Sequence, residues 1–175
     1  MKRKFVVLTL VLLLSLAITV PALADATVTI SGGALSVTAQ SIGFGTVTLN
    51  GSDQTVFDGD ATLWQAKDPT GTGSGWHVTI AATDFVDGGN TIAVSNFKAK
   101  LDDSNISTVA GNAAPTSSLT AYTSLSTTAQ TFMSAASGAG MGTYTFVPDF
   151  SLGVAAETYA GSYTSTVTVA IVSGP

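Results

Sequence analysis

The stretch Gly71–Phe85, GTGSGWHVTIAATDF, decides the fold class, because a glycine-rich turn leads directly into an alternating segment. The apolar residues Val78 and Ile80 are in phase with Trp76, whereas His77 falls on the opposite side. A period of two in apolar residues predicts a half-buried β-strand. We therefore expect the turn to deliver Trp76 onto the first residue of a central strand.

The same alternation recurs along the chain. Threonine alternates with aliphatic residues in 27–30, 46–49 and 163–171, and with aromatic residues in 143–146. Turn sequences separate these segments, among them Asp-Gly-Gly-Asn at 87–90. Many short strands with frequent turns predict an all-β protein, an antiparallel β-sandwich of the immunoglobulin-like or Greek-key type.

Residues 105–142 differ in composition, since they are rich in Ser, Thr, Ala and Gly and nearly free of charge. They could form a flexible insertion or a set of weak edge strands. The apolar residues Leu119, Leu125 and Phe132 favour a packed excursion over a disordered linker. We expect one domain over residues 25–175 that carries this excursion.

The N-terminus has the pattern of a secretory signal peptide over residues 1–24. Three basic residues precede an apolar run at 5–20, and Ala22-Leu23-Ala24 predicts cleavage before Asp25. An uncleaved membrane anchor is the competing interpretation, but the apolar run is short for a span. We expect a secreted protein with no membrane association after cleavage.

Charge excludes two classes of partner. The 175 residues carry a formal net charge of −5 and no cysteine, and loss of the three leader bases makes the charge −8. Lys67, Lys98 and Lys100 are then the only strong bases. Nucleic-acid binding needs clustered bases to neutralise phosphates, and anionic lipids attract proteins through the same groups. We expect neither partner, and no disulfide.

Catalytic and metal sites are weakly supported. A Ser-His-Asp arrangement would have to use His77, the only histidine, with Ser74 and Asp84 near it in sequence, and the strand pattern points His77 toward solvent. The acidic pairs are Asp58-Gly59-Asp60 and Asp102-Asp103, and the only glutamate, Glu157, lies far away in sequence. Aspartates in turns more often cap backbone N–H groups than bind Ca²⁺. We expect no enzyme activity, no metal and no cofactor.

Aromatic side chains are the remaining candidates for a ligand site. They could form a stacking platform for sugars, or they could fill the core. Trp76 favours the core, because its in-phase neighbours are aliphatic. The aromatic residues considered for a platform are Trp64, Trp76, Tyr122, Tyr144, Tyr159 and Tyr163.

Four stretches, taken in order, resemble the WxL domain of Gram-positive bacterial surface proteins. They begin with GGALSV and IGFGTVTLNGSDQTV within Gly32–Val56 and continue with Gly71–Phe85. GAGMGTYTFVPDFSLGV at Gly138–Val154 and AGSYTSTVTVAIVSGP at Ala160–Pro175 complete the set. The first Trp-x-Leu motif reads Trp-His-Val, and the second reads Val-Ala-Ile at residues 169–171, without its tryptophan.

The resemblance implies a β-sandwich displayed at the cell surface and held non-covalently to peptidoglycan, with other surface proteins as further partners. Loss of the second tryptophan puts that wall contact in question if the paired motifs make it. The candidate wall-binding residues are Trp64, Trp76, Val78, Tyr144 and Tyr163.

Two other functions compete with a wall-binding module. Thr-rich strands, low charge and the absence of cysteine suit a filament or matrix subunit that pairs edge strands with its neighbours. A secreted carbohydrate-binding protein or enzyme would depend on the aromatic residues or on His77.

Overall fold

The structure is a computed structural model that describes residues 26–59 and 62–175. The chain divides into two units, residues 1–30 and 31–175. Of the first unit only residues 26–30 are described, and they are exposed and form no strand. The expected signal peptide lies outside the described residues. The second unit is built almost entirely from β-strands, which confirms the all-β prediction.

Three four-stranded antiparallel sheets form the second unit. The β3 sheet has the order β1 (Ser36–Thr38), β3 (Trp64–Asp68), β12 (Gly142–Phe146) and β8 (Ile106–Gly111). The β13 sheet has the order β10 (Thr123–Ser124), β7 (Phe97–Lys100), β13 (Asp149–Val154) and β2 (Gln54–Phe57). The β4 sheet has the order β14 (Val167–Ser173), β4 (Trp76–Ala82), β11 (Gln130–Ala135) and β9 (Thr116–Ser117).

A hairpin and two short 3-10 turns complete the fold. The hairpin joins β5 (Phe85–Asp87) to β6 (Asn90–Ile92), with Asp87 opposite Asn90, so the turn predicted at 87–90 is confirmed. The 3-10 turns are η1 (Val94–Asn96) and η2 (Asp103–Asn105). No other pair among the strands of the described residues joins chain neighbours, so the sheets depend on long connections.

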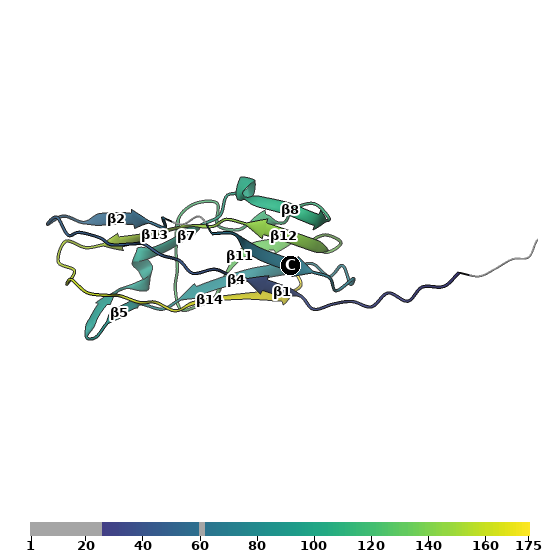
Figure 1. Cartoon of the computed structure of the whole chain (residues 1–175), viewed down its shortest axis with the longest axis horizontal. Coiled ribbons are helices and arrows are strands. Elements are labelled where there is room, and N and C mark those ends of the chain that lie inside the picture. Colours follow the sequence, from purple (N-terminus) through teal and green to yellow (C-terminus); the bar gives the residue numbers. More distant parts are fainter. Residues whose placement is uncertain (1–25, 60–61) are drawn as a thin grey trace, which may run out of the picture. The chain divides into compact units, whose positions relative to one another are not determined.

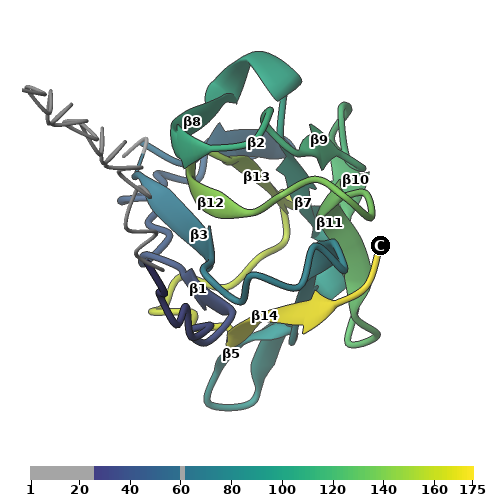
Figure 2. The same ribbon diagram turned by 90° about the vertical axis from the view of Figure 1, so that its right-hand side faces the viewer.

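The sheets pack as a sandwich around one aromatic core. Figure 1 shows β13 and β12 following each other along one side, with β4 and β14 along the other. Seen from the end in Figure 2, the strands surround the core. Trp64 joins the layers, because its ring centroid lies 5.7 to 6.3 Å from those of Phe132, Phe146 and Phe150 on β11, β12 and β13.

The alternation that predicted a strand after Trp76 is confirmed in β4. Trp76, Val78 and Ile80 are fully buried, whereas the residues between them are partly exposed. The strand is central because it pairs with β14 on one side and β11 on the other. The 143–146 pattern is likewise confirmed as β12, and the final strand β14 begins at Val167.

Two expectations differ from the structure. Residues 27–30 and 46–49 have strand-like sequences but form no strand, because no neighbouring strand pairs with them. Residues 105–142 are packed, and of their two expected alternatives the structure shows edge strands: β8, β9 and β10 lie at sheet edges, and only β11 lies inside its sheet. Their buried apolar side chains are Ile106, Leu119, Leu125, Phe132, Met133 and Ala135.

Candidate functional site

Trp76 lies where two glycine-rich turns meet. Its indole Nε1 donates a 2.8 Å hydrogen bond to the carbonyl of Gly140, and its ring packs against Tyr144 with centroids 5.9 Å apart. Gly140 has φ +77°, and a Cβ there would lie 2.7 Å from Nε1 of Trp76. Gly75 has φ +73°, and a Cβ there would lie 2.5 Å from the carbonyl oxygen of Ala135. Only glycine fits this contact between the turns at either position.

Tyr144 connects a third segment to the same place. Its hydroxyl donates to the carbonyl oxygens of Asn112, 3.3 Å away, and Met141, 3.1 Å away. Asn112 and Met141 also exchange two hydrogen bonds, of 3.0 and 3.1 Å, with each other. Burial raises the pKa of Tyr144. The phenol thus stays protonated and holds two loop backbones from beneath.

The C-terminal strand β14 brings a fourth segment, which reaches Gly174, to the same place. β14 pairs with β4 so that Ile171 lies opposite Val78, which places the Leu positions of the two Trp-x-Leu motifs side by side. The N–H of Gly174 donates to the carbonyl of Gly75 at 2.9 Å. Nδ1 of His77 lies 2.7 Å from the carbonyl oxygen of Gly174, and it must be the donor because a carbonyl only accepts.

These contacts assemble one surface, which we call the loop face: residues 69–75 and 136–141, Asn112 and Gly174. A chain of hydroxyls crosses it, starting from the buried carboxylate of Asp68, which accepts from Thr70 Oγ1 at 2.6 Å. Thr70 Oγ1 lies 3.0 Å from Thr72 Oγ1, and Ser74 Oγ donates to Thr72 Oγ1 at 3.1 Å. The alternating Thr, Ser and Gly of 70–75 carried this signal, which the sequence reasoning missed.

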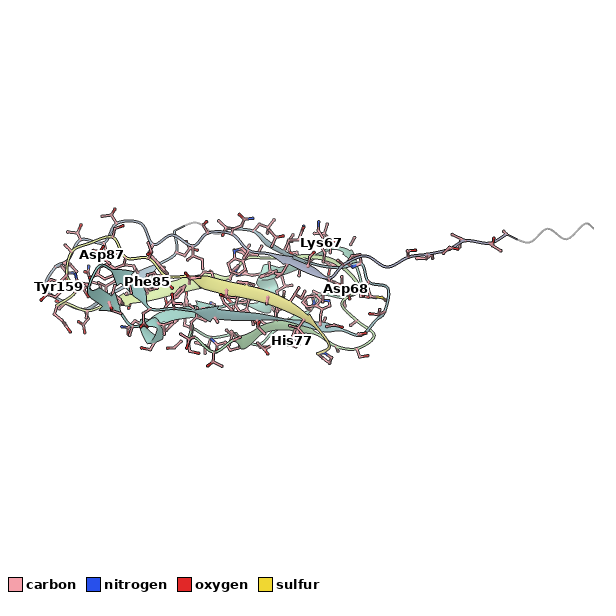
Figure 3. The ribbon with its side chains drawn as sticks, turned by 90° about the horizontal axis from the view of Figure 1, so that it is seen from below. Lys67, Asp68, His77, Phe85, Asp87 and Tyr159 are labelled. Carbon is pink, nitrogen blue, oxygen red and sulfur yellow. The ribbon has the colours of Figure 1, made fainter. Side chains whose placement is uncertain are left out.

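The five candidate wall-binding residues do not form one site. Trp64, Trp76, Val78 and Tyr144 have no exposed surface, so in this structure they pack the core and cannot touch a wall polymer. Trp64 lies in the middle of the core. Tyr163 is half-buried and lies far from the loop face. Figure 3 shows this separation, with Asp68 and His77 at one end and Phe85 and Tyr159 at the other.

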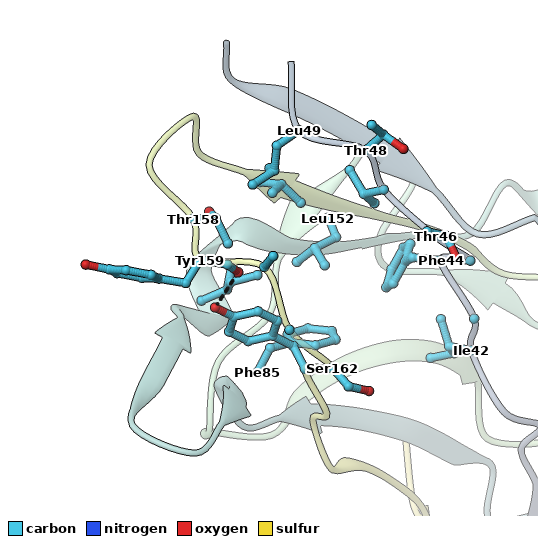
Figure 4. A pocket seen from close by; sticks show the side chains of 18 residues that line it. Ile42, Phe44, Thr46, Thr48, Leu49, Phe85, Leu152, Thr158, Tyr159 and Ser162 are labelled. Carbon is cyan, nitrogen blue, oxygen red and sulfur yellow. Dashed lines mark hydrogen bonds between the residues drawn. The ribbon is translucent and has the colours of Figure 1, made fainter. Parts of the chain in front are cut away.

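Tyr163 lines a groove of about 810 Å³ at the end opposite the loop face. Residues 42–49 form one wall, 158–163 form the other, and the apolar floor consists of Phe85, Ile92, Leu152 and Val154. In Figure 4, Phe85 and Leu152 lie between the walls, and the ring of Tyr159 points away from the groove. None of the lining residues is charged.

Comparison with known families decides the identity of this fold. The family model described as "WxL domain surface cell wall-binding" matches residues 20–175. The chain belongs to the WxL family. A comparison with curated proteins finds no match.

Family membership makes this chain a cell-surface protein with a cell wall-binding domain. In this WxL domain the Trp-His-Val segment, the Gly140–Tyr144 segment and the closing strand meet at the loop face, and all three belong to stretches that resemble the family. Residues 42–49 and 160–163, which also belong to such stretches, line the groove at the other end. None of the helices in the described residues is long and apolar enough to cross a membrane.

The residues considered for catalysis in the WxL domain have separate partners. Ser74 Oγ bonds to Thr72, and His77 bonds to the carbonyl of Gly174. Asp84 Oδ1 accepts from the N–H of Val94 at 2.8 Å. These contacts place the three side chains in three different hydrogen-bond networks.

The acidic pairs considered for a metal also have other roles. Asp102 pairs with Lys100 at 2.8 Å, and that hydrogen bond raises the pKa of Lys100. Asp103 accepts from the N–H of Ser117 at 2.6 Å. Asp58 accepts from the N–H of Gly43 at 3.4 Å, and Asp60 lies outside the described residues. In the described residues these aspartates act as turn and ion-pair partners.

Proposed function

We propose that the protein is held non-covalently at the cell wall and that the loop face contacts peptidoglycan. One observation carries the proposal: the Trp-His-Val segment, the Gly140–Tyr144 segment and the closing strand, which all belong to stretches that resemble the family, meet at this face. Trp76 and Tyr144 bind the carbonyls of Gly140, Met141 and Asn112 from beneath. The motif aromatics are then positioning residues that fix the backbone presented to the wall.

The chemistry of the loop face suits the uncharged groups of peptidoglycan. Residues 69–75 read PTGTGSG and residues 136–141 read ASGAGM, so neither loop carries a charge. Both present hydroxyls and backbone groups, which form hydrogen bonds with sugar hydroxyls, acetamido groups and peptide links. Because the protein is acidic, attraction between charges contributes little. Binding should therefore resist moderate salt.

The protein acts by binding and not by catalysis in this proposal. Its only histidine donates to a backbone carbonyl, and the hydroxyl of Ser74 is engaged with Thr72. A general base needs hydrogen-bond reach to its nucleophile, and these contacts direct the two groups elsewhere. Family membership agrees, since the family is described by wall binding.

Sedimentation of the purified chain with purified peptidoglycan sacculi tests the proposal. Thr72→Ala removes the central hydroxyl of the loop face without touching the core, and we expect it to lower the bound fraction several-fold. Thr91→Ala, an exposed threonine on β6 at the other end, is the matched control and should bind as wild type. The bound fraction of wild type should change little between low and moderate salt.

Two results would contradict the proposal. Wild type could stay in the supernatant of purified sacculi yet sediment with walls that retain their proteins, in which case a surface protein is the partner. Equal loss of binding in Thr72→Ala and Thr91→Ala would place the contact away from the loop face. Circular dichroism of each variant excludes misfolding as the cause.

A further inference from the structure

The groove opposite the loop face is bounded by two segments that lack strand partners. Residues 44–49 and 159–163 belong to no strand, and neither segment makes a backbone–backbone hydrogen bond within the described residues. Among the described residues, side chains reach only two of their carbonyls, those of Thr48 and Tyr159. Most of the backbone donors and acceptors beside the groove therefore have no partner in this part of the chain and can bind a new one.

The two walls of the groove have the properties expected of a place where one further strand could be added between them. Residues 46–49 read Thr-Val-Thr-Leu, which has the alternation of a half-buried strand. The floor is apolar, since it is formed by Phe85, Ile92, Leu152 and Val154. An extended peptide laid between the walls would pair with free backbone groups and cover the floor with alternate side chains.

The chain itself contains a segment of matching chemistry. Residues 27–30 read Thr-Val-Thr-Ile, and the side chains of Val28 and Ile30 are 83% and 88% exposed. These residues also form no strand. Exposed apolar side chains that alternate with threonine are typical of a strand whose partner is another molecule.

We propose that residues 26–30 of one copy enter the groove of a second copy as an added strand. Val28 and Ile30 face the floor, and Thr27 and Thr29 face solvent. None of the described residues that line the groove, and none of residues 26–30, is charged. Donor and acceptor are different surfaces, so the contact is head-to-tail and extends into chains of copies.

A segment of this protein fits better than a glycan. The free groups on both walls are backbone N–H and C=O groups, which are the groups that an added strand pairs with. Each copy also supplies one donor segment for each groove. Oligosaccharide binding in the groove is one of the outcomes that the test distinguishes.

Two variants separate donor from acceptor. Val28→Asp with Ile30→Asp disables the donor segment, and Ala160→Trp fills the groove from an exposed position on its wall. In sedimentation velocity we expect wild type to form larger species as concentration rises, whereas each variant stays monomeric. An equimolar mixture of the two variants should stop at dimers, because it contains one working donor and one working groove per pair.

A peptide of residues 26–31 tests the groove directly. We expect it to bind the donor variant, and Asp in place of its Val and Ile should weaken binding by about tenfold or more. Val109→Asp, a 61% exposed valine on the edge strand β8, is the matched control and should assemble as wild type.

Several results would overturn the proposal. Wild type could remain monomeric at every concentration, whether or not the peptide binds. The donor variant could assemble as well as wild type, or Val109→Asp could block assembly, which would make β8 the interface. Chitin oligosaccharides that displace the peptide from the groove would assign the groove to a sugar.

Discussion

The loop face and the groove lie at opposite ends of the same sandwich and are built in opposite ways. At the loop face, buried side chains from β4 and β12 bind the backbone of separate loops. At the groove, two segments that belong to no strand lie beside an apolar floor without backbone partners in the described residues. The comparison teaches that the Trp-His-Val motif lies at the end whose loops are held by buried side chains, which is the rigid end. Strand-like sequence without a partner strand lies at the groove, which is the end open to another molecule.

Hydrogen exchange gives the largest contrast between the two ends. Amides of β4 are paired on both sides, so they should exchange only when most of the fold opens, at a cost of about 5–15 kcal/mol. Amides of residues 44–49 and 159–163 should exchange at nearly unprotected rates in the monomer. Mass spectrometry of exchanged peptides measures both. Similar protection at the two ends would remove the basis of the comparison.

Truncation of Trp76 should give the next largest effect. Trp76→Ala removes a fully buried indole, its hydrogen bond to Gly140 and its contact with Tyr144, and should lower the free energy of unfolding by about 3–5 kcal/mol. Tyr159→Ala at the groove end is the control, because that side chain is 71% exposed and should change stability by about 0.5 kcal/mol or less. Urea unfolding measures both variants, and equal stabilities would refute the packing role.

The sequence predicted the structure at the loop face, the rigid end, better than the structure at the groove, the open end. The period of two after Trp76 identified a central strand and its buried face, because alternation reports directly on one-sided burial. The same rule failed at residues 27–30 and 46–49, where the pattern is present but no strand is available for pairing. Alternation describes which side of a segment is apolar, and it carries no information about a partner.

The candidate site was harder to predict than the fold. Trp64, Trp76 and Tyr144 were recognised as important, but spacing does not reveal their contacts. The hydrogen bonds of Trp76 to Gly140 and of Tyr144 to Asn112 join residues 64 and 32 positions apart, and Trp64 packs against aromatic rings inside the core. Residues 105–142 lacked an apolar pattern strong enough to separate strands from an insertion. Their strands became visible only when long-range pairing with β4 and β12 placed them.

Gly138 and Gly140, in the loop 136–141, allow the destabilisation caused by steric crowding to be measured apart from that caused by backbone strain. Gly138→Ala and Gly140→Ala both place alanine at positive φ, +79° and +77°, at a cost of about 1–2 kcal/mol. At Gly138 nothing lies within 4 Å of an added Cβ, whereas at Gly140 the Cβ would overlap Ala135 and Trp76. Overpacking should therefore make Gly140→Ala less stable than Gly138→Ala by a further 1–3 kcal/mol or so in urea unfolding. Equal losses would mean that the turns are not held against Trp76.

Removal of one hydroxyl should give the smallest effect. Tyr144→Phe keeps the ring but loses the hydrogen bonds to Asn112 and Met141, and should cost about 1 kcal/mol at pH 8. Because burial raises the pKa of Tyr144 in the fold, its contribution is complete below the pKa of an unfolded tyrosine, near 10, and is lost as pH rises further. Wild type should therefore lose more stability than Tyr144→Phe between pH 8 and pH 11 in urea unfolding.

Tyr163→Phe supplies the comparison at the groove end for the pH 8 measurement. Its hydroxyl donates to the carbonyl of Tyr159, four residues away in the same exposed segment, and ties no second loop. Its loss should cost less than that of the Tyr144 hydroxyl, because solvent replaces an exposed hydrogen bond more readily than a buried one. If Tyr163→Phe proved the more costly change, the groove end would be the more tightly held of the two, and its walls would be poor candidates to receive a strand.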